Sequence, residues 1–265
     1  DGVRMGMMLA APAGNDILFD DALCEQGRNF CSKIWNAFRL IKGWTVDDNI
    51  QAPDAAKLAV HWFESKQNEV AAEVADLFSK YRLSEALMAV YKLFWDEFSS
   101  WYLEMIKPAY GQGIDRTTYD ATLCFLDNLL HLLHPFMPFI TEELWQQMYE
   151  RNAEEGESLM VSALSMDTYV DTAFVAQFEV VKGVISNIRS IRLQKNIAQK
   201  EPLDLQVLGE NPVAEFNAVI QKMCNLSSIT VVESKAEGAS SFMVGTTEYA
   251  VPLGNMIDVE AEIAR

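Results

Sequence analysis

The chain reads DDALCEQGRNFCSKIWNAFRLIKG over residues 20–43. Apolar side chains recur in this stretch at the three- and four-residue spacing of a helix that buries one stripe: Phe30, Ile34, Ala37, Phe38 and Ile41. Gly43 follows at the position where a helix cap is expected. The pattern predicts a helix from about residue 20 to residue 41 that packs one face against other helices.

Four more stretches have the same helical periodicity, at residues 55–80, 84–106, 115–133 and 138–150. The stretch 84–106 is the most aromatic part of the chain, and Pro108 with two nearby glycines ends it. Short connections between helices favour antiparallel neighbours. We therefore expect a mainly α fold in which residues 20–152 form a helical bundle.

The pattern changes after residues 152–158, which are polar and acidic as in a linker. A helical pattern at 173–194 precedes strand-like residues 203–208, a short helix near 213–224, a β-branched run at 229–232 and a strand pair around 242–251. Residues 159–256 are thus predicted to form a small α+β module.

Charge is distributed unevenly along the chain. The 265 residues carry 21 Lys+Arg against 38 Asp+Glu, a formal net charge of −17, which argues at first sight against a nucleic-acid partner. Residues 24–44, however, carry a local charge of +3, and residues 182–200 a local charge of +5. Because salt screens charges over about 8 Å, a polyanion docked on either segment would feel mainly that segment.

Enzyme signatures are weak in this sequence. It contains no nucleophile elbow, no Walker loop and no dinucleotide fingerprint. His131 and His134 near Cys124 have a superficially metal-like spacing, and Glu142 with Glu143 could pair as catalytic carboxylates. Structural histidines, and acidic residues favoured by a helix dipole, explain these features better. We expect no catalytic residue, metal ion or cofactor in this chain.

The predicted helix at 20–41 carries a polar face beside its apolar stripe. On a helical wheel, the residues that fall within about 60° of one another are Asn29, Lys33, Asn36 and Leu40. Arg28 and Arg39 flank them. Asparagine matches an adenine edge, lysine and arginine neutralise phosphate, and an apolar side chain can support an unstacked base of single-stranded RNA. Spacing alone nevertheless favours the simpler interpretation of a solvated helix face.

The second basic segment is also predicted to be helical. An outward face would then carry Lys182, Ser186, Arg189 and Asn196. A surface that follows phosphates and an ordinary solvated face are equally compatible with this pattern.

Several stretches give the chain a resemblance to the valyl-tRNA synthetases, a family of class Ia aminoacyl-tRNA synthetases. Residues 27–40, GRNFCSKIWNAFRL, resemble that family's signature GRNFxNKxWNAxRF. Residues 14–20, 95–104 and 134–145 agree in the same order. The last stretch is shared with the isoleucine and leucine enzymes, so the first is what favours valine.

This resemblance implies a helical anticodon-binding domain that follows a catalytic domain. Residues 1–19 would be the linker after that domain, and residues 257–265 the start of a coiled-coil arm. The HIGH and KMSKS motifs are absent, so this chain alone would be inactive. The longer protein would use ATP and Mg²⁺ to attach valine to tRNA(Val).

The partners implied by the resemblance are tRNA(Val) and the catalytic domain of the same polypeptide. We expect a monomer that binds no membrane, and a cytoplasmic location, which the four cysteines without a CxxC pair also favour. No apolar run reaches the roughly 18 residues of a membrane span.

The resemblance also implies RNA contacts at Lys33, Asn36, Arg39 and Leu40, to which wheel geometry adds Asn29. Some family members have an aromatic residue at the position of Leu40, where it stacks on a base. Two alternatives stay open: the same role with isoleucine or leucine tRNA, and an acidic helical scaffold that binds protein through an aromatic groove. Residues 134–145 we expect to pack and cap a helix, with Trp145 in the core.

Overall fold

The computed structural model describes residues 1–11, 20–149 and 158–254. The chain separates into two compact units, of which the first contains residues 1–53 and 63–170 and the second residues 54–62 and everything from residue 171. Residues 12–19 of the linker expected at 1–19, all but the last residue of the linker expected at 152–158, and the arm expected at 257–265 lie outside the described residues.

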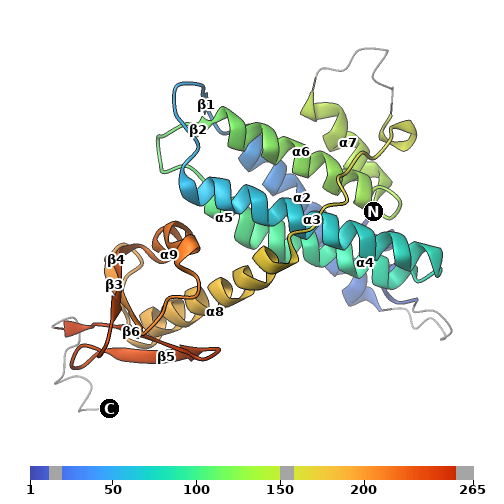
Figure 1. Cartoon of the computed structure of the whole chain (residues 1–265). Coiled ribbons are helices and arrows are strands. Elements are labelled where there is room, and N and C mark those ends of the chain that lie inside the picture. The colour runs from blue at the N-terminus through green and yellow to red at the C-terminus, as the bar shows by residue number, and fades with distance from the viewer. Residues whose placement is uncertain (12–19, 150–157, 255–265) are drawn as a thin grey trace. The chain divides into compact units, whose positions relative to one another are not determined.

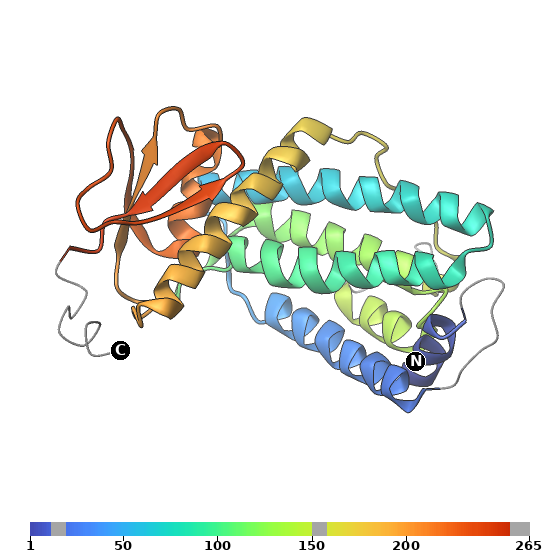
Figure 2. The same ribbon diagram turned by 90° about the horizontal axis from the view of Figure 1, so that it is seen from below.

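The first unit is a bundle of helices, as predicted (Figure 1). Its elements are α1 (Gly2–Leu9), α2 (Asp21–Lys42), most of α3 (Asp54–Ser79), α4 (Leu83–Lys92), the π-helical η1 (Leu93–Tyr102), α5 (Leu103–Ile106), α6 (Arg116–Leu133), α7 (Pro138–Met148) and the 3₁₀ turn η2 (Leu159–Val161). Two short strands, β1 (Val46–Asp47) and β2 (Ile114–Asp115), pair in parallel. In Figures 1 and 2 the long helices run alongside one another.

Helix α2 forms as its sequence pattern predicts. The Asp20 carboxylate caps its first turn by accepting a hydrogen bond from the Ala22 N–H at 2.9 Å, and Gly43 is the C-terminal cap. The side chains that α2 buries are the predicted stripe, Phe30, Ile34, Ala37, Phe38 and Ile41, together with Gly27. The polar face is therefore left facing outward.

The aromatic stretch is continuous through α4, η1 and α5, and its rings build the core of the bundle. Phe63 of α3 lies within 5.0–5.2 Å, centroid to centroid, of the rings of Phe98, Tyr102 and Phe125. The Tyr102 hydroxyl lies 2.8 Å from Thr122 Oγ1, so a buried polar group is paired inside this cluster. Burial raises the pKa of Tyr102.

The segment 1–19, expected to be a linker, contains the helix α1 in its described part, and α1 packs closely on α2. A Cβ on Gly6 would lie 2.7 Å from the Cys24 backbone nitrogen, and one on Gly27 would lie 2.5 Å from the Gly2 carbonyl oxygen. Glycine at both positions allows this approach, which periodicity in a single short stretch does not reveal.

Residues 134–145 have the packing and capping role that was predicted. Trp145 is buried, and the Thr141 hydroxyl donates to the Met137 carbonyl at 2.8 Å. The Asp1 carboxylate accepts from the backbone N–H groups of Phe139, at 3.3 Å, and Ile140, at 2.6 Å, and so caps the first turn of α7. No sequence pattern connects residues so far apart along the chain.

The second unit is a small α+β fold, as predicted. It contains α8 (Thr172–Gln194), β3 (Leu203–Leu208), the 3₁₀ turn η3 (Ala214–Phe216), α9 (Asn217–Cys224), β4 (Leu226–Val232), β5 (Ser240–Val244) and β6 (Thr247–Val251). Its described strands form one sheet in the order β4-β3-β6-β5, in which β3 is parallel to β4 and antiparallel to β6. Leu203, Leu205 and Val207 of β3 point into the core at the period of two that a strand requires.

The first residues of α3 belong to this second core. The Trp62 ring stacks on Phe178 with centroids 4.2 Å apart, and the His61 ring meets Phe174 edge-on at 4.5 Å. Helix α3 therefore contributes side chains to both units.

A search of the helices in the described ranges found none with the length and apolar character of a membrane span.

Candidate nucleic-acid interface

The outward face of α2 carries the residues that were predicted to bind RNA. Asn29, Asn36 and Arg39 are exposed, whereas Lys33 and Leu40 are half-buried against the bundle. Across residues 1–11, 20–149 and 158–254, the side chains of Asn29, Asn36 and Arg39 form no hydrogen bond or ion pair with one another or with other groups. These polar groups are therefore available to a ligand.

Lys33 is positioned by an aromatic ring from another element. Its Nζ lies 5.2 Å from the centre of the Trp95 ring, which belongs to η1. Trp95 in turn stacks on Tyr91 at 5.6 Å and lies 6.2 Å from Phe30. A cation over an indole face is attracted to it by about 0.5–1 kcal/mol at an exposed site. The Trp95 ring therefore restricts the position of the Lys33 ammonium. Because the ring carries no negative charge, the positive charge of the ammonium is not neutralised.

Two other basic residues of this segment are engaged elsewhere. The Arg28 guanidinium pairs with Glu25 at 3.0 Å, and the Lys42 ammonium donates to the Met148 carbonyl at 3.2 Å. With Arg28 paired to Glu25, the local charge of +3 comes from Lys33, Arg39 and Lys42, of which Lys33 and Arg39 lie on or beside the face that carries Asn36.

Trp95 is a contributor that the sequence did not identify for this face. It lies within the aromatic stretch and within a segment similar to the synthetase family, but no role at this face was predicted for it. A tryptophan at the rim of an apolar cluster, half-buried here, is the signal that could have identified it.

The second basic segment does not form a continuous strip. Lys182, expected on an outward face, has a side chain only 12% exposed; its Nζ lies 2.8 Å from Glu179 and 5.2 Å from the Trp62 ring centre. Arg192, counted in the local +5, is buried and donates to the carbonyl oxygens of Ala198 at 2.9 Å and Cys224 at 2.7 Å. Of the four residues predicted to share the outward face, Ser186, Arg189 and Asn196 are exposed.

The histidine and glutamate features have structural partners. His131 Nε2 lies 2.8 Å from Ser162 Oγ, and His134 Nδ1 lies 2.8 Å from Thr141 Oγ1. The Glu142 carboxylate accepts from the Ser158 hydroxyl and from the Leu159 N–H, each at 3.0 Å. In the described part of the chain, no three His, Cys, Asp or Glu side chains gather as metal ligands would.

The four cysteines are free thiols, and burial disfavours the thiolate form of Cys31 and Cys224. Burial raises the pKa of Cys224 to about 12, and burial also raises the pKa of Cys31 on α2. Neither thiol has the lowered pKa of a nucleophilic cysteine.

Comparisons with known proteins point to one family. Residues 60–207 match the family described as the anticodon-binding domain of tRNA ligase. The whole chain is 99% identical to part of a valine–tRNA ligase of Bacteroides thetaiotaomicron and 73% identical to part of one from Phocaeicola vulgatus. A valine–tRNA ligase of Christiangramia forsetii is 46% identical over 99% of the chain.

Two aspects of coverage bear on the candidate interface. The chain spans 30% of the length of each of these relatives. The family match begins at residue 60, after α2, whereas the alignments with the first two relatives cover the whole chain and therefore include α2. The family is thus established by the bundle and the following module, and the role of α2 depends on its own geometry.

Proposed function

This chain belongs to the family of anticodon-binding domains of tRNA ligases, and from this premise we propose that it recognises the anticodon of a valine tRNA through the outward face of α2. The observation that carries the proposal is the arrangement of Lys33, held over the Trp95 ring, beside exposed polar groups of Asn36 and Arg39. A pre-positioned cation loses less conformational entropy on binding than a freely rotating one.

Each side chain has a role suited to its chemistry. Asn36 pairs a donor and an acceptor with the edge of the adenine common to the middle position of valine anticodons, and Asn29 supports the same strand one helical turn or more away. Lys33 and Arg39 donate to base acceptors or to phosphate oxygens. Leu40 supports an unstacked base with an apolar surface in place of an aromatic ring.

The relatives' names support a proposal for the longer polypeptide. It attaches valine to tRNA(Val) with ATP and Mg²⁺, through a catalytic domain outside this chain, and works as a cytoplasmic monomer. The present chain supplies identity and orientation by holding the anticodon. That division fits a chain spanning 30% of its relatives and a first unit that offers polar and cationic groups on one helix face.

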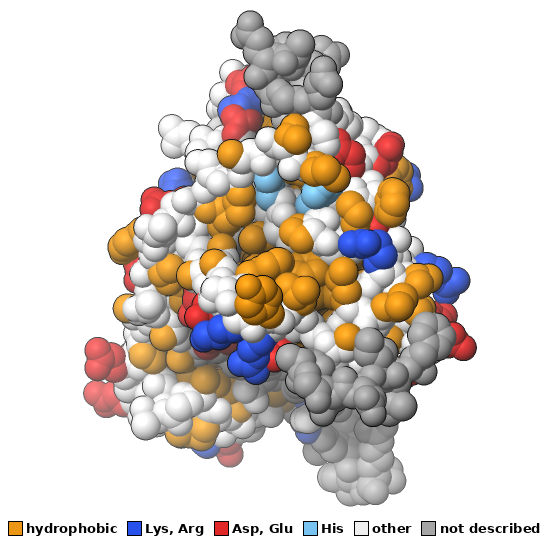
Figure 3. Space-filling view, turned by 90° about the vertical axis from the view of Figure 1, so that its right-hand side faces the viewer, with side chains coloured by type: hydrophobic (Ala, Val, Ile, Leu, Met, Phe, Trp, Pro, Cys, Tyr) orange, Lys and Arg blue, Asp and Glu red, His pale blue; other side chains and the backbone are white. Residues whose placement is uncertain are grey.

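An apolar surface of the first unit suits contact with that catalytic domain. Large hydrophobic side chains are exposed on α1, on the first turn of α7 and on η2: Val3 (60%), Met7 (51%), Phe139 (72%), Met160 (73%) and Val161 (75%). Figure 3 faces the side of Figure 1 where the N-terminus lies, and hydrophobic side chains gather in the middle of that view, with most acidic ones at its edges. Surfaces of this kind mark protein contacts.

The experiment that tests the anticodon proposal compares two RNA stem–loops. The chain should bind a loop with a valine anticodon more tightly than one with the middle adenine replaced, and the logarithm of its affinity should fall linearly with the logarithm of salt concentration. Preference for an isoleucine or leucine anticodon would assign the face to another tRNA. Affinity that is independent of salt would favour a protein-binding scaffold instead.

A further inference from the structure

A pocket opens directly after α2, in the loop that joins this helix to β1 and the loop that joins α5 to β2. It has a volume of about 470 Å³, within the range of small-molecule sites. Its lining consists of residues 43–45 and 107–113. None of these residues is among the five proposed to contact the anticodon on the outward face of α2, here called the anticodon face (Asn29, Lys33, Asn36, Arg39 and Leu40). The pocket therefore has no role in the proposed function so far.

The pocket continues the anticodon face along the helix axis. Asn29, Asn36 and Gly43 are spaced seven residues apart, and positions seven apart on an α-helix deviate by only about 20° around its axis. Gly43 has helical dihedral angles, φ −83° and ψ −8°, so the stripe runs on to the pocket's rim. Asn36 and Gly43 are separated by roughly 10 Å of helix rise.

Aromatic groups line this pocket at an exposed position. The Tyr110 side chain is fully exposed, at 107% relative accessibility, and Trp44 is half-buried on the opposite loop. Single-stranded RNA is bound largely by stacking of unpaired bases on such rings. The Tyr110 ring adds little to the core from this position, and its faces are open to stacking with a ligand.

The backbone of both loops is fixed. The Ile114 N–H donates to the Thr45 carbonyl, and the Gln112 N–H to the Ala109 carbonyl, each at 2.9 Å. A Cβ on Gly113 would lie 2.9 Å from the Thr45 carbonyl oxygen, so glycine permits the close approach of the two loops. The pairing of β1 with β2 continues this contact beyond the pocket. The pocket walls are therefore formed before any ligand arrives.

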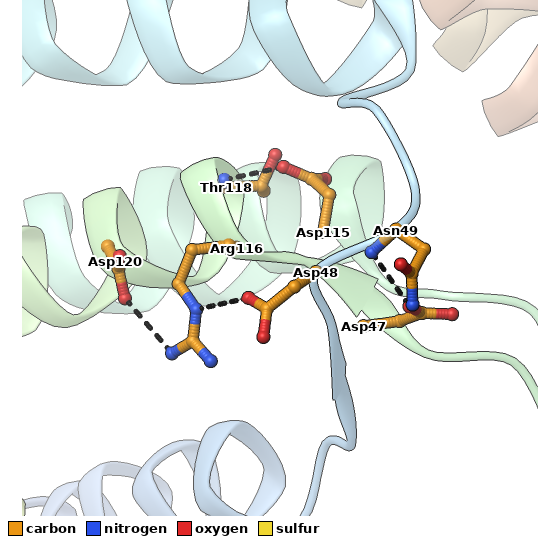
Figure 4. A network of polar contacts seen from close by, with 7 residues as sticks. All are labelled: Asp47, Asp48, Asn49, Asp115, Arg116, Thr118 and Asp120. Atoms are coloured by element: carbon orange, nitrogen blue, oxygen red, sulfur yellow. Dashed lines mark hydrogen bonds and ion pairs between the residues drawn. The ribbon is translucent and has the colours of Figure 1, made fainter.

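The charges around the pocket favour a neutral ligand group. Carboxylates follow both pocket loops closely along the chain. Figure 4 shows them: the Asp48 carboxylate lies 2.8 Å from the Arg116 guanidinium, the Asp120 carboxylate lies 3.8 Å from the same group, and the Asp47 carboxylate accepts from Asn49. Among the lining residues the only charged side chain is Lys107, which lies 3.8 Å from Glu104. Two carboxylates on one guanidinium, with the Asp47 carboxylate nearby, leave an excess of negative charge next to the pocket, which disfavours a phosphate and accommodates a base.

From these observations we propose that the pocket between residues 43–45 and 107–113 binds one unstacked base of the RNA loop, at a position outside the three anticodon nucleotides. The proposal rests on the proposed function, because it requires that the anticodon lie on α2. Tyr110 stacks on the base, Trp44 forms the facing apolar wall, and the phosphates on either side stay on the outside, toward Lys33 and Arg39.

The test uses the whole chain and fluorescently labelled stem–loops carrying a valine anticodon. Tyr110→Ala should weaken binding by at least about fivefold, the lower end of the measured contribution of one base–aromatic stack. Because Tyr110 is fully exposed, the variant should unfold at an unchanged temperature. Tyr169→Ala is the matched control: Tyr169 is also exposed, at 63%, and its replacement should leave binding unchanged.

Single abasic substitutions along the loop identify the base. An abasic substitution at one position outside the anticodon should weaken binding to the wild type. The same substitution should not weaken binding to Tyr110→Ala any further. The pocket assignment is overturned if Tyr110→Ala binds normally, or if no such position exists, while Lys33→Ala and replacement of the middle adenine still weaken binding. If those two changes are also without effect, the anticodon proposal itself has failed.

Discussion

The Nζ of Lys33 lies 5.2 Å from the centre of the Trp95 ring. This contact joins two of the stretches that resemble the synthetase family, 27–40 and 95–104, across the interface between α2 and η1. It holds the half-buried ammonium of Lys33 in one orientation, although no carboxylate pairs with it among the described residues. The same contact gives the first prediction.

Lys33→Ala should lower the affinity for a valine-anticodon stem–loop by about 1–3 kcal/mol if the ammonium donates to a base edge. Lys80→Ala is the control, because Lys80 is exposed, lies outside α2 and pairs with Asp76 at 2.6 Å. Fluorescence anisotropy measures both.

Trp95→Leu should weaken RNA binding less than Lys33→Ala does. The double variant Lys33→Ala/Trp95→Leu should bind like Lys33→Ala alone, because the ring acts by orienting the lysine. Additive losses would show that the ring does not act through the lysine.

Leu40→Phe should raise RNA affinity by about threefold to tenfold, because an aromatic ring stacks on an unpaired base better than an aliphatic side chain does. Leu193→Phe provides a control, since Leu193 is 84% exposed on α8. Equal gains from the two variants would indicate a nonspecific effect of added aromatic surface. An unchanged affinity for Leu40→Phe would remove Leu40 from the interface.

Arg192 has a structural role in the second unit, and its loss should be seen in stability. Arg192→Met leaves the Ala198 and Cys224 carbonyls without their donor, and should lower the free energy of unfolding by more than about 2 kcal/mol. Arg189→Met, at an exposed position on the same helix, should change it by less than about 0.5 kcal/mol. Urea denaturation followed by circular dichroism measures both changes in unfolding free energy. Similar changes for the two variants would contradict a buried structural role for Arg192.

His134 should make the first unit sensitive to acid. Thr141 donates its hydroxyl proton to Met137, so His134 Nδ1–H donates to Thr141, and the buried Nε2 has no hydrogen-bond partner among the described residues. Burial lowers the pKa of His134 below its usual 6.5, despite the nearby Glu142 carboxylate. Protonation would place a second, unpaired N–H in this buried position.

The unfolded chain then binds the proton more readily than the folded one. The contribution of His134 to stability is complete above about pH 6.5 and is lost as the pH falls through the lower pKa of the folded state. His134→Asn, which keeps a donor for Thr141, should show a smaller loss of unfolding free energy between about pH 7.5 and pH 5. A pH dependence identical to that of the wild type would exclude His134 as its source.

Local patterns predicted much of this molecule because they reflect local physics. The stripe from Phe30 to Ile41 repeats at the helical period, and Leu203–Leu208 alternate as a strand must, so both elements were found at or near their observed bounds. The outward face of α2 follows from the same wheel, because what is not buried on an amphipathic helix is exposed.

Contacts between distant segments could not be predicted in this way. Lys182 and Arg192 counted as surface charges until the structure placed them against Trp62 and against backbone carbonyls. The helix α1, the cap that Asp1 provides for α7 and the pocket beside Gly43 each depend on segments brought together by tertiary packing. A count of charges along the sequence does not reveal which groups each charged side chain contacts.

The measurement that tests the central claim most directly is the affinity of the wild type and Asn36→Ala for two stem–loops, one with a valine anticodon and one with its middle adenine replaced. The wild type should prefer the valine loop by at least about fivefold, and Asn36→Ala should lose most of that preference. Equal affinity of the wild type for both loops would contradict anticodon recognition, and an unchanged preference in Asn36→Ala would contradict recognition by α2.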